Sequence, residues 1–202
     1  MYLSKILING PACRNPYEIH RMLWRLFPEG KDARRDFLFR VGYSDRNHAE
    51  VLMQSEKKPN DRTSNNAKVM AWKDFSWVLH TGQRLRFLLI ANPIKTIHDE
   101  AGRKNKTGET KKCRVPIIRE EDQRAWIVRK FQDAATAGTL IINPMSPMRF
   151  RKNREDRAGK IQPVSFQGIL NVKTPESMTD LVQIGIGPAK AFGCGMLSLA
   201  RV

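Results

Sequence analysis

The alternation of polar and apolar residues predicts that the first ninety positions form strands around one helix. Residues 2–8 alternate as a half-buried strand does. Residues 17–27 carry apolar side chains at helical spacing, after Asn15 as N-cap and Pro16 in the first turn. The pattern of residues 68–79 does not decide between helix and strand. The further strands expected here are 35–41, 50–55 and 83–91. The order resembles a ferredoxin-like, RRM-type unit whose uncertain link holds a short helix.

The second half repeats this order of elements. Helical spacing predicts one helix over 120–135 and another over 174–184, where Gly185 ends it. A strand that begins at Val115 precedes the first of these helices. The remaining strands are expected at 139–143, 160–172 and 196–199.

Between the two halves the composition changes. Residues 95–114 are rich in lysine, threonine and glycine and poor in apolar side chains, so they cannot bury themselves and are expected to form a flexible basic linker. The sequence therefore predicts an α+β protein with tandem ferredoxin-like (RRM-like) domains, residues 1–94 and 115–202, and a C-terminal glycine-rich loop.

The charge of the chain restricts its partners. Of the 202 residues, 36 are Lys or Arg and 20 are Asp or Glu, which gives a net charge of +16 and a pI near 10.2. Such a field attracts polyanions, of which RNA, DNA and anionic membrane surfaces are the main candidates. No apolar run approaches the ~20 residues of a spanning helix, so no membrane role is expected.

The cysteines and the N-terminus predict a cytoplasmic protein without cofactor. Cys13, Cys113 and Cys194 are odd in number and far apart, which argues against both a disulfide framework and a zinc site. The first residues enter the predicted strand and show no signal-peptide pattern. We therefore expect reduced cytoplasmic thiols and no metal site.

The glycine-rich segment 185–195 is the first candidate site. With Gly185 and Gly187 near its start, it leaves little side-chain bulk, so its backbone N–H groups could approach a phosphate, with Lys190 supplying charge. The alternative is a turn that needs positive φ at several positions. The spacing fits neither the dinucleotide motif nor the P-loop.

The first predicted helix provides a second candidate. Tyr17, His20 and Trp24 are spaced i, i+3 and i+7 and share one flank beside the core stripe. They are either amphipathic side chains at a core boundary or, since an imidazole titrates near neutrality, groups suited to proton transfer.

A third candidate is the basic segment 149–160, which could enter a groove of structured RNA or be a solvated loop. Its candidate contacts to an RNA stem are Arg149, Arg151, Arg154 and Arg157. Lys160, Lys190 and Lys95 are further candidates for contacts with the RNA backbone.

Several motifs together resemble one family, the CasE family of CRISPR repeat-processing endoribonucleases in the type I-E system. The resemblance spans the whole chain in the same order. Its motifs are MYLSK at residues 1–5, NPYEIH at 15–20, ANPIK at 91–95, RVP at 114–116, GIGPAK at 185–190 and GCGMLS at 193–198. Ile90 departs from it, because an arginine is expected before the ANP motif.

The resemblance implies a metal-independent ribonuclease. Such an enzyme binds the stem-loop of a CRISPR repeat transcript and cuts at the base of the stem, where attack by a 2′-hydroxyl leaves a 2′,3′-cyclic phosphate. The family's catalytic histidine and tyrosine match His20 and Tyr17. Family members usually keep the cut RNA as subunits of the Cascade assembly. A non-catalytic subunit that only binds an RNA hairpin stays as the alternative, because RRM-like folds commonly bind without cutting.

Overall fold

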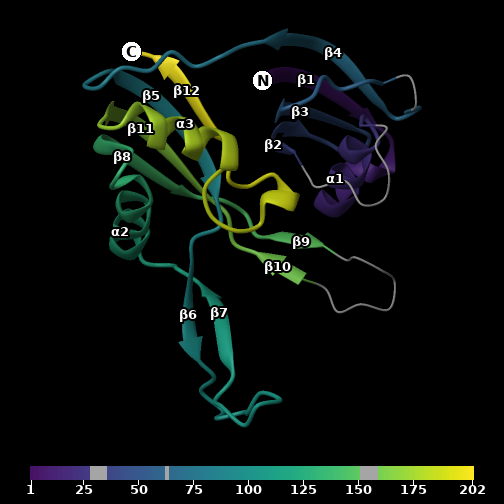
Figure 1. Ribbon diagram of the computed structural model, residues 1–202. Coiled ribbons are helices and arrows are strands. Elements are labelled where there is room, and N and C mark those ends of the chain that lie inside the picture. The colour runs from purple at the N-terminus through teal and green to yellow at the C-terminus, as the bar shows by residue number, and fades with distance from the viewer. Residues whose placement is uncertain (28–35, 62–63, 151–158) are drawn as a thin grey trace.

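The computed structural model describes residues 1–27, 36–61, 64–150 and 159–202, which form two antiparallel four-stranded sheets, each with its own hydrophobic core (Figure 1). In both sheets apolar side chains alternate with exposed ones along the strands, so that one face is buried. No helix in this part of the chain is long and apolar enough to cross a bilayer.

The N-terminal sheet has the strand order β2-β3-β1-β4. Helix α1 (Pro16–Trp24) packs Ile19 and Leu23 against its buried face. The strands are β1 (Tyr2–Asn9), β2 (Phe37–Ser44), β3 (His48–Ser55) and β4 (Ala67–Asp74). A short 3₁₀ turn, η1 (Pro11–Arg14), joins β1 to α1. The expected strand, helix, strand, strand order is confirmed here.

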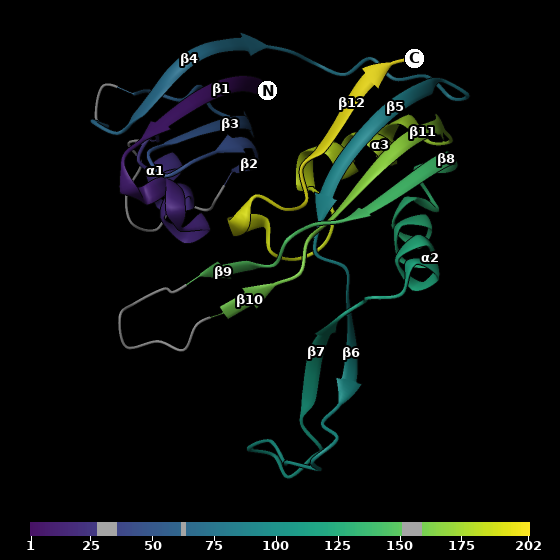
Figure 2. The ribbon, with the colours of Figure 1, turned by 180° about the vertical axis from the view of Figure 1, so that it is seen from behind.

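The C-terminal sheet has the strand order β12-β5-β11-β8, and two helices contribute to its core. The strands are β5 (Arg84–Ala91), β8 (Ala135–Pro144), β11 (Val164–Val172) and β12 (Leu197–Arg201). The helices are α2 (Glu120–Phe131) and α3 (Pro175–Ile184), which lie together beside the sheet in Figure 2. Taken in chain order, β5, α2, β8, β11, α3 and β12 form a complete ferredoxin-like unit.

The pairing of β5 corrects the expected division of the chain. The strand predicted at 83–91 was expected to complete the N-terminal unit, but β5 pairs with β11 and β12 and is the first strand of the C-terminal sheet. The fourth N-terminal strand is β4, within the segment whose pattern was ambiguous. The sheets therefore divide between Asp74 and Arg84, not at residue 94.

Two hairpins are inserted into the C-terminal unit. The first consists of β6 (Ile94–His98) and β7 (Lys112–Pro116), so residues 95–114 lie inside this unit and are not a linker between two units. Arg103 donates to the carboxylate of Asp99 at 2.6 Å and holds the pKa of that carboxyl well below its usual range. The second hairpin consists of β9 (Met148–Phe150) and β10 (Gly159–Ile161).

The two units meet where α3 ends. The Gln54 side chain of β3 donates to the carbonyl oxygen of Val182 at 2.8 Å, across the boundary. Beyond α3, a Cβ at Gly193 would lie 3.2 Å from the ring of Phe39 in β2. The glycine-rich segment is therefore packed against the N-terminal sheet, close to α1.

Candidate active site

Helix α1 presents the predicted flank of polar aromatic side chains. The Asn15 side chain accepts the Tyr17 N–H at 3.1 Å, which caps the helix, and Pro16 occupies its first turn. Because Ile19 and Leu23 face the core, Tyr17, His20 and Trp24 lie on the neighbouring flank and all three line one cavity. The predicted grouping is confirmed.

His20 lies against an aromatic wall. Its ring centroid is 5.6 Å from that of Phe37, 6.0 Å from Trp24 and 6.3 Å from Phe39, to which it is nearly parallel. The Nε2 atom is buried, while the residue as a whole is only half-buried. Packing thus holds the imidazole in one orientation at the cavity wall, as a proton-transfer group requires.

The glycine-rich segment reaches this wall from the other end of the chain. Gly185, Gly187 and Gly193 have φ near +80°, and side chains at these positions would meet Leu38, Trp126 and Phe39. The alternative given for this segment, a turn that needs positive φ at several positions, is therefore confirmed. The Gly185 N–H is donated to the Leu181 carbonyl oxygen at 3.0 Å, so it is not available to a phosphate.

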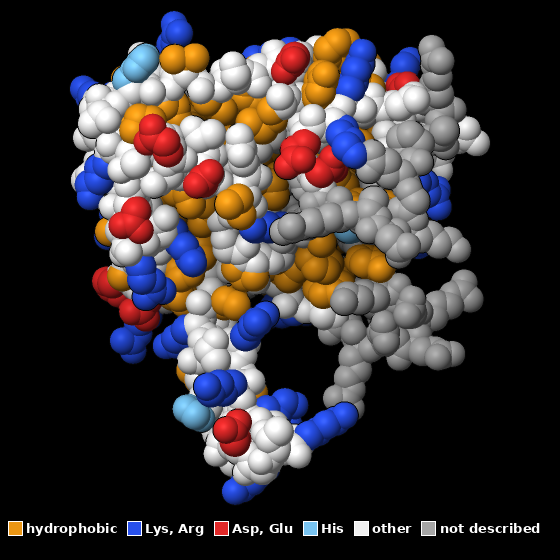
Figure 3. Space-filling view, in the orientation of Figure 1, with side chains coloured by type: hydrophobic (Ala, Val, Ile, Leu, Met, Phe, Trp, Pro, Cys, Tyr) orange, Lys and Arg blue, Asp and Glu red, His pale blue; other side chains and the backbone are white. Residues whose placement is uncertain are grey.

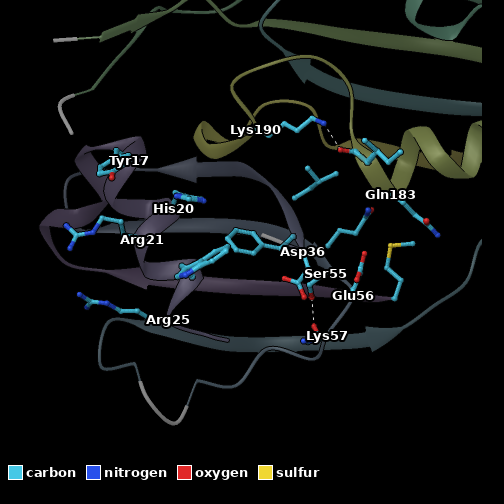
Figure 4. Close-up of a pocket in the computed structure, with 16 residues that line it drawn as sticks. Tyr17, His20, Arg21, Arg25, Asp36, Ser55, Glu56, Lys57, Gln183 and Lys190 are labelled. Atoms are coloured by element: carbon cyan, nitrogen blue, oxygen red, sulfur yellow. Dashed lines mark hydrogen bonds between the residues drawn. The ribbon is translucent and has the colours of Figure 1, made fainter. Parts of the chain in front are cut away.

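A short turn in this segment, η2 (Lys190–Phe192), carries two side chains toward α1. Nζ of Lys190 donates to the Ile184 carbonyl oxygen at 2.7 Å and lies beside the cavity (Figure 4). The Phe192 ring lies 6.5 Å from that of Tyr17 and 4.1 Å from that of Phe150 in β9. This turn therefore contacts both α1 and the β9–β10 hairpin through Phe192, and it places the ammonium group of Lys190 beside the cavity.

The cavity has a volume of about 1350 Å³ and lies between the two units. Its wall combines side chains from α1, from β2 and β3, and from the end of α3. Figure 4 shows His20 on one side and Ser55, Glu56 and Lys57 on the other. The lining residues are Met1, Tyr17, His20, Arg21, Trp24, Arg25, Asp36, Phe37, Leu38, Gln54, Ser55, Glu56, Lys57, Gln183, Ile184 and Lys190.

Two cations of the cavity, Arg21 and Arg25, are not among the residues predicted from the sequence. Arg21 lies on α1 and Arg25, one helical turn later, is its C-cap residue; Arg21 donates to Glu18 at 3.1 Å. Their pattern resembled an ordinary solvated face, and the signal that could have identified them was the i+4 and i+8 spacing from Tyr17.

The other predicted RNA contacts lie outside the cavity lining. Arg149 pairs with Lys160 across the β9–β10 hairpin, and β9 contacts α1. Lys95 lies on β6 of the other hairpin, where Figure 3 shows Lys and Arg side chains gathered along the projection. Arg151, Arg154 and Arg157 lie outside the described residues.

Two of the three thiols, those of Cys13 and Cys194, are buried and poor candidates for chemistry. Burial raises the pKa of the Cys194 thiol to about 12 and also raises that of Cys13. Within the described ranges, no three His, Cys, Asp or Glu side chains form a group that could hold a metal ion.

Comparison with known proteins gives full-length matches. A family model described as CRISPR associated protein matches residues 1–201. The chain is 44% identical over 203 residues to the CRISPR system Cascade subunit CasE of Escherichia coli (strain K12), with 99% of both chains covered. It is 31% identical to the CRISPR-associated endoribonuclease Cse3 of Thermus thermophilus, with 99% of this chain and 100% of the relative covered.

Solved structures agree with these matches. The crystal structure of the CRISPR-associated protein Cas6e from E. coli K-12 matches with a TM-score of 0.86 at 41% identity, over 100% of both chains. Cse3 bound to a 19-nucleotide RNA matches with a TM-score of 0.78 at 30% identity, also over 100% of both chains. A chain of E. coli Cascade bound to a double-stranded DNA target has a TM-score of 0.64 at 30% identity.

Proposed function

The chain belongs to the CasE family of CRISPR-associated proteins, and from this membership we propose that it is a metal-independent endoribonuclease that cuts CRISPR repeat RNA at the base of its stem-loop. One relative is named an endoribonuclease and another a Cascade subunit. The observation that carries the proposal is the grouping of His20 and Tyr17 with cations from both units around one cavity.

The reaction begins with the 2′-hydroxyl that precedes the scissile phosphate. His20 acts as general base or acid on this hydroxyl or on the 5′-oxygen that leaves, and Tyr17 orients it or relays the proton. A positioned group of this kind contributes about 10²- to 10⁴-fold. The products are a 2′,3′-cyclic phosphate and a 5′-hydroxyl.

The cations of the cavity supply the electrostatic part. Lys190, Arg21 and Arg25 can face the phosphate from two directions, and charge aimed at the phosphorane lowers the barrier in a partly dehydrated site. Two of these groups come from α1 and the third from the C-terminal unit, so cleavage depends on how the units are docked.

The remaining basic surfaces serve binding. Arg149 and Lys160 on the β9–β10 hairpin and Lys95 on β6 contact the RNA backbone or stem, with Arg151, Arg154 and Arg157 predicted to join them. After the cut, the protein keeps the RNA and acts as a subunit of Cascade in the cytoplasm.

The test is incubation of the protein with its repeat RNA in excess EDTA, beside His20→Ala, with analysis of the RNA ends. A single cut that leaves a 2′,3′-cyclic phosphate, absent with His20→Ala, is the expected result. An intact hairpin that stays tightly bound would overturn the proposal in favour of a subunit that only holds RNA.

A further inference from the structure

We propose that Trp72, on strand β4, is a stacking site for an unpaired nucleotide that flanks the RNA stem. The inference rests on the proposed function, because it extends the cavity around His20 to a subsite for single-stranded RNA. It assigns a role to an exposed tryptophan that the cleavage chemistry does not use.

Trp72 lies on the same face of the N-terminal sheet as His20. Trp72 pairs with Ser4, which is buried on the face that α1 covers. In the adjacent row of this face, Phe37 pairs with Ser55 and Ser55 with Tyr2. Side chains that are directly paired in antiparallel strands point to the same side. The two rows therefore place Trp72 and the Phe37 ring beside His20 on one face of the sheet.

Residues of the cavity lining are chain neighbours of residues that contact Trp72. Met1, Ser55 and Lys57 line the cavity, and the residues that follow Met1 and Lys57 are Tyr2 and Lys58, both of which contact Trp72. From β2 to β4 there are three inter-strand steps, roughly 14 Å. At about 3.4 Å per stacked nucleotide, that is a span of roughly four nucleotides.

The surroundings of Trp72 fit a nucleotide. The residue is 48% exposed, its ring is 5.9 Å from that of Tyr2, and Nζ of Lys58 lies 3.5 Å from its ring centroid. A base can stack on the indole while the ammonium group of Lys58 turns to the adjoining phosphate. The nearest carboxylate on β4, Asp74, is paired with the N-terminal ammonium group at 3.3 Å, which reduces its repulsion of a phosphate.

The experiment compares three RNA hairpins: one with a single unpaired nucleotide on each side, one with six on the 5′ side and one with six on the 3′ side. Single-turnover cleavage is measured against protein concentration for wild type and Trp72→Ala. With one of the long flanks, Trp72→Ala is expected to raise the half-saturating concentration by about 5- to 100-fold, the loss expected for one stacked base. The maximal rate and all constants for the short hairpin stay unchanged.

Two variants make the result specific. Trp72→Phe keeps an aromatic face and is expected to retain most of the flank effect. Met70→Ala removes a neighbouring side chain that is 52% exposed and is expected to change nothing. Equal losses with short and long flanks, or no loss with either long flank, would overturn the proposal. So would a variant that binds flanked RNA normally but fails to join the protein subunits of Cascade, because the patch is then a protein interface.

Failure of the proposed function is recognised separately. If the wild-type protein cuts none of the three RNAs, there is no ribonuclease activity to explain. Filter-binding affinities for the same RNAs then still decide whether a flank is held, and whether Trp72 holds it.

Discussion

The two sheets have the same strand order but differ in what covers them. In the C-terminal unit α3 connects β11 to β12, and with α2 it fills the core over the sheet. In the N-terminal unit the matching connection from β3 to β4 contains no helix within residues 56–61 and 64–66, and in the described residues α1 packs on the sheet without a second α-helix.

The difference shows where a cavity can form in a duplicated fold. Glu56 and Lys57, which begin the β3–β4 connection, line the cavity that contains His20. The complete unit supplies the opposite wall through Gln183, Ile184 and Lys190. The incomplete N-terminal unit thus provides the helix that carries His20 and open space, and the complete C-terminal unit provides the opposite wall.

The largest expected effect is at helix α1, which carries the proposed catalytic histidine. His20→Ala is expected to slow single-turnover cleavage by about 10²- to 10⁴-fold while hairpin affinity is retained, because the change removes proton transfer and leaves the phosphate contacts in place. The matched control is His80→Ala, which lies outside the cavity and should cut at the wild-type rate. Cleavage by His20→Ala near the wild-type rate would contradict the assignment.

Tyr17→Phe tests the second group on this helix. It keeps the ring beside Phe192 and removes only the hydroxyl, so a loss of about 10- to 100-fold in rate is expected if a hydrogen bond to a charged group is lost. The control is Tyr43→Phe, whose exposed hydroxyl lies 3.4 Å from Asp45. An unchanged rate for Tyr17→Phe would leave the tyrosine a packing role only.

On the side of the complete unit, the expected effect is on stability. Gly187→Ala forces an L side chain to φ +79°, with its Cβ 3.1 Å from the Trp126 ring, and should lower the free energy of unfolding by about 2–3 kcal/mol. Gly102→Ala, at φ +65° with open space around it, is the control and should cost less. Urea unfolding measures both. Equal losses of unfolding free energy in the two variants would mean that the contact between residue 187 and Trp126 does not contribute to the effect.

The smallest effect concerns the charge that the complete unit contributes. Lys190→Met should weaken RNA binding several-fold and reduce the slope of log affinity against log salt by about 0.7–0.9, as the loss of one phosphate contact does. The control is Lys5→Met, which removes the salt bridge between Lys5 on β1 and Glu50 on β3. If the salt slope stays unchanged in Lys190→Met, the glycine-rich segment is only a turn.

Local patterns predicted most elements and the flank of α1, because capping, periodicity and side-chain direction are short-range properties. Which strands pair with one another could not be predicted in this way. The pattern of β5 predicts a strand but does not show which sheet the strand joins. The pattern of β4 did not identify a strand, because this edge strand, with Trp72 exposed, does not alternate regularly between buried and exposed residues.

The site shows the same limit. His20 and Tyr17 share a helix and were found together, whereas the contact between α1 and the Lys190 turn joins positions about 170 residues apart. Nothing in the sequence near Arg25 indicates that the opposite side of its cavity contains Lys57 and Gln183. Those neighbours follow from the docking of two units, which has no local signature.

The pairing of β5 also sets an order of folding during synthesis. All four strands of the N-terminal sheet exist once Asp74 has been added. Leu89 of β5 pairs with Leu197 of β12, which is added more than a hundred residues later. At ~5–20 residues per second, the ribosome needs roughly 5–20 s to make the intervening chain. The nascent protein therefore carries His20 on a finished sheet before Lys190 exists, and the cavity around His20 gains its second wall only after residues 183–190 have been added.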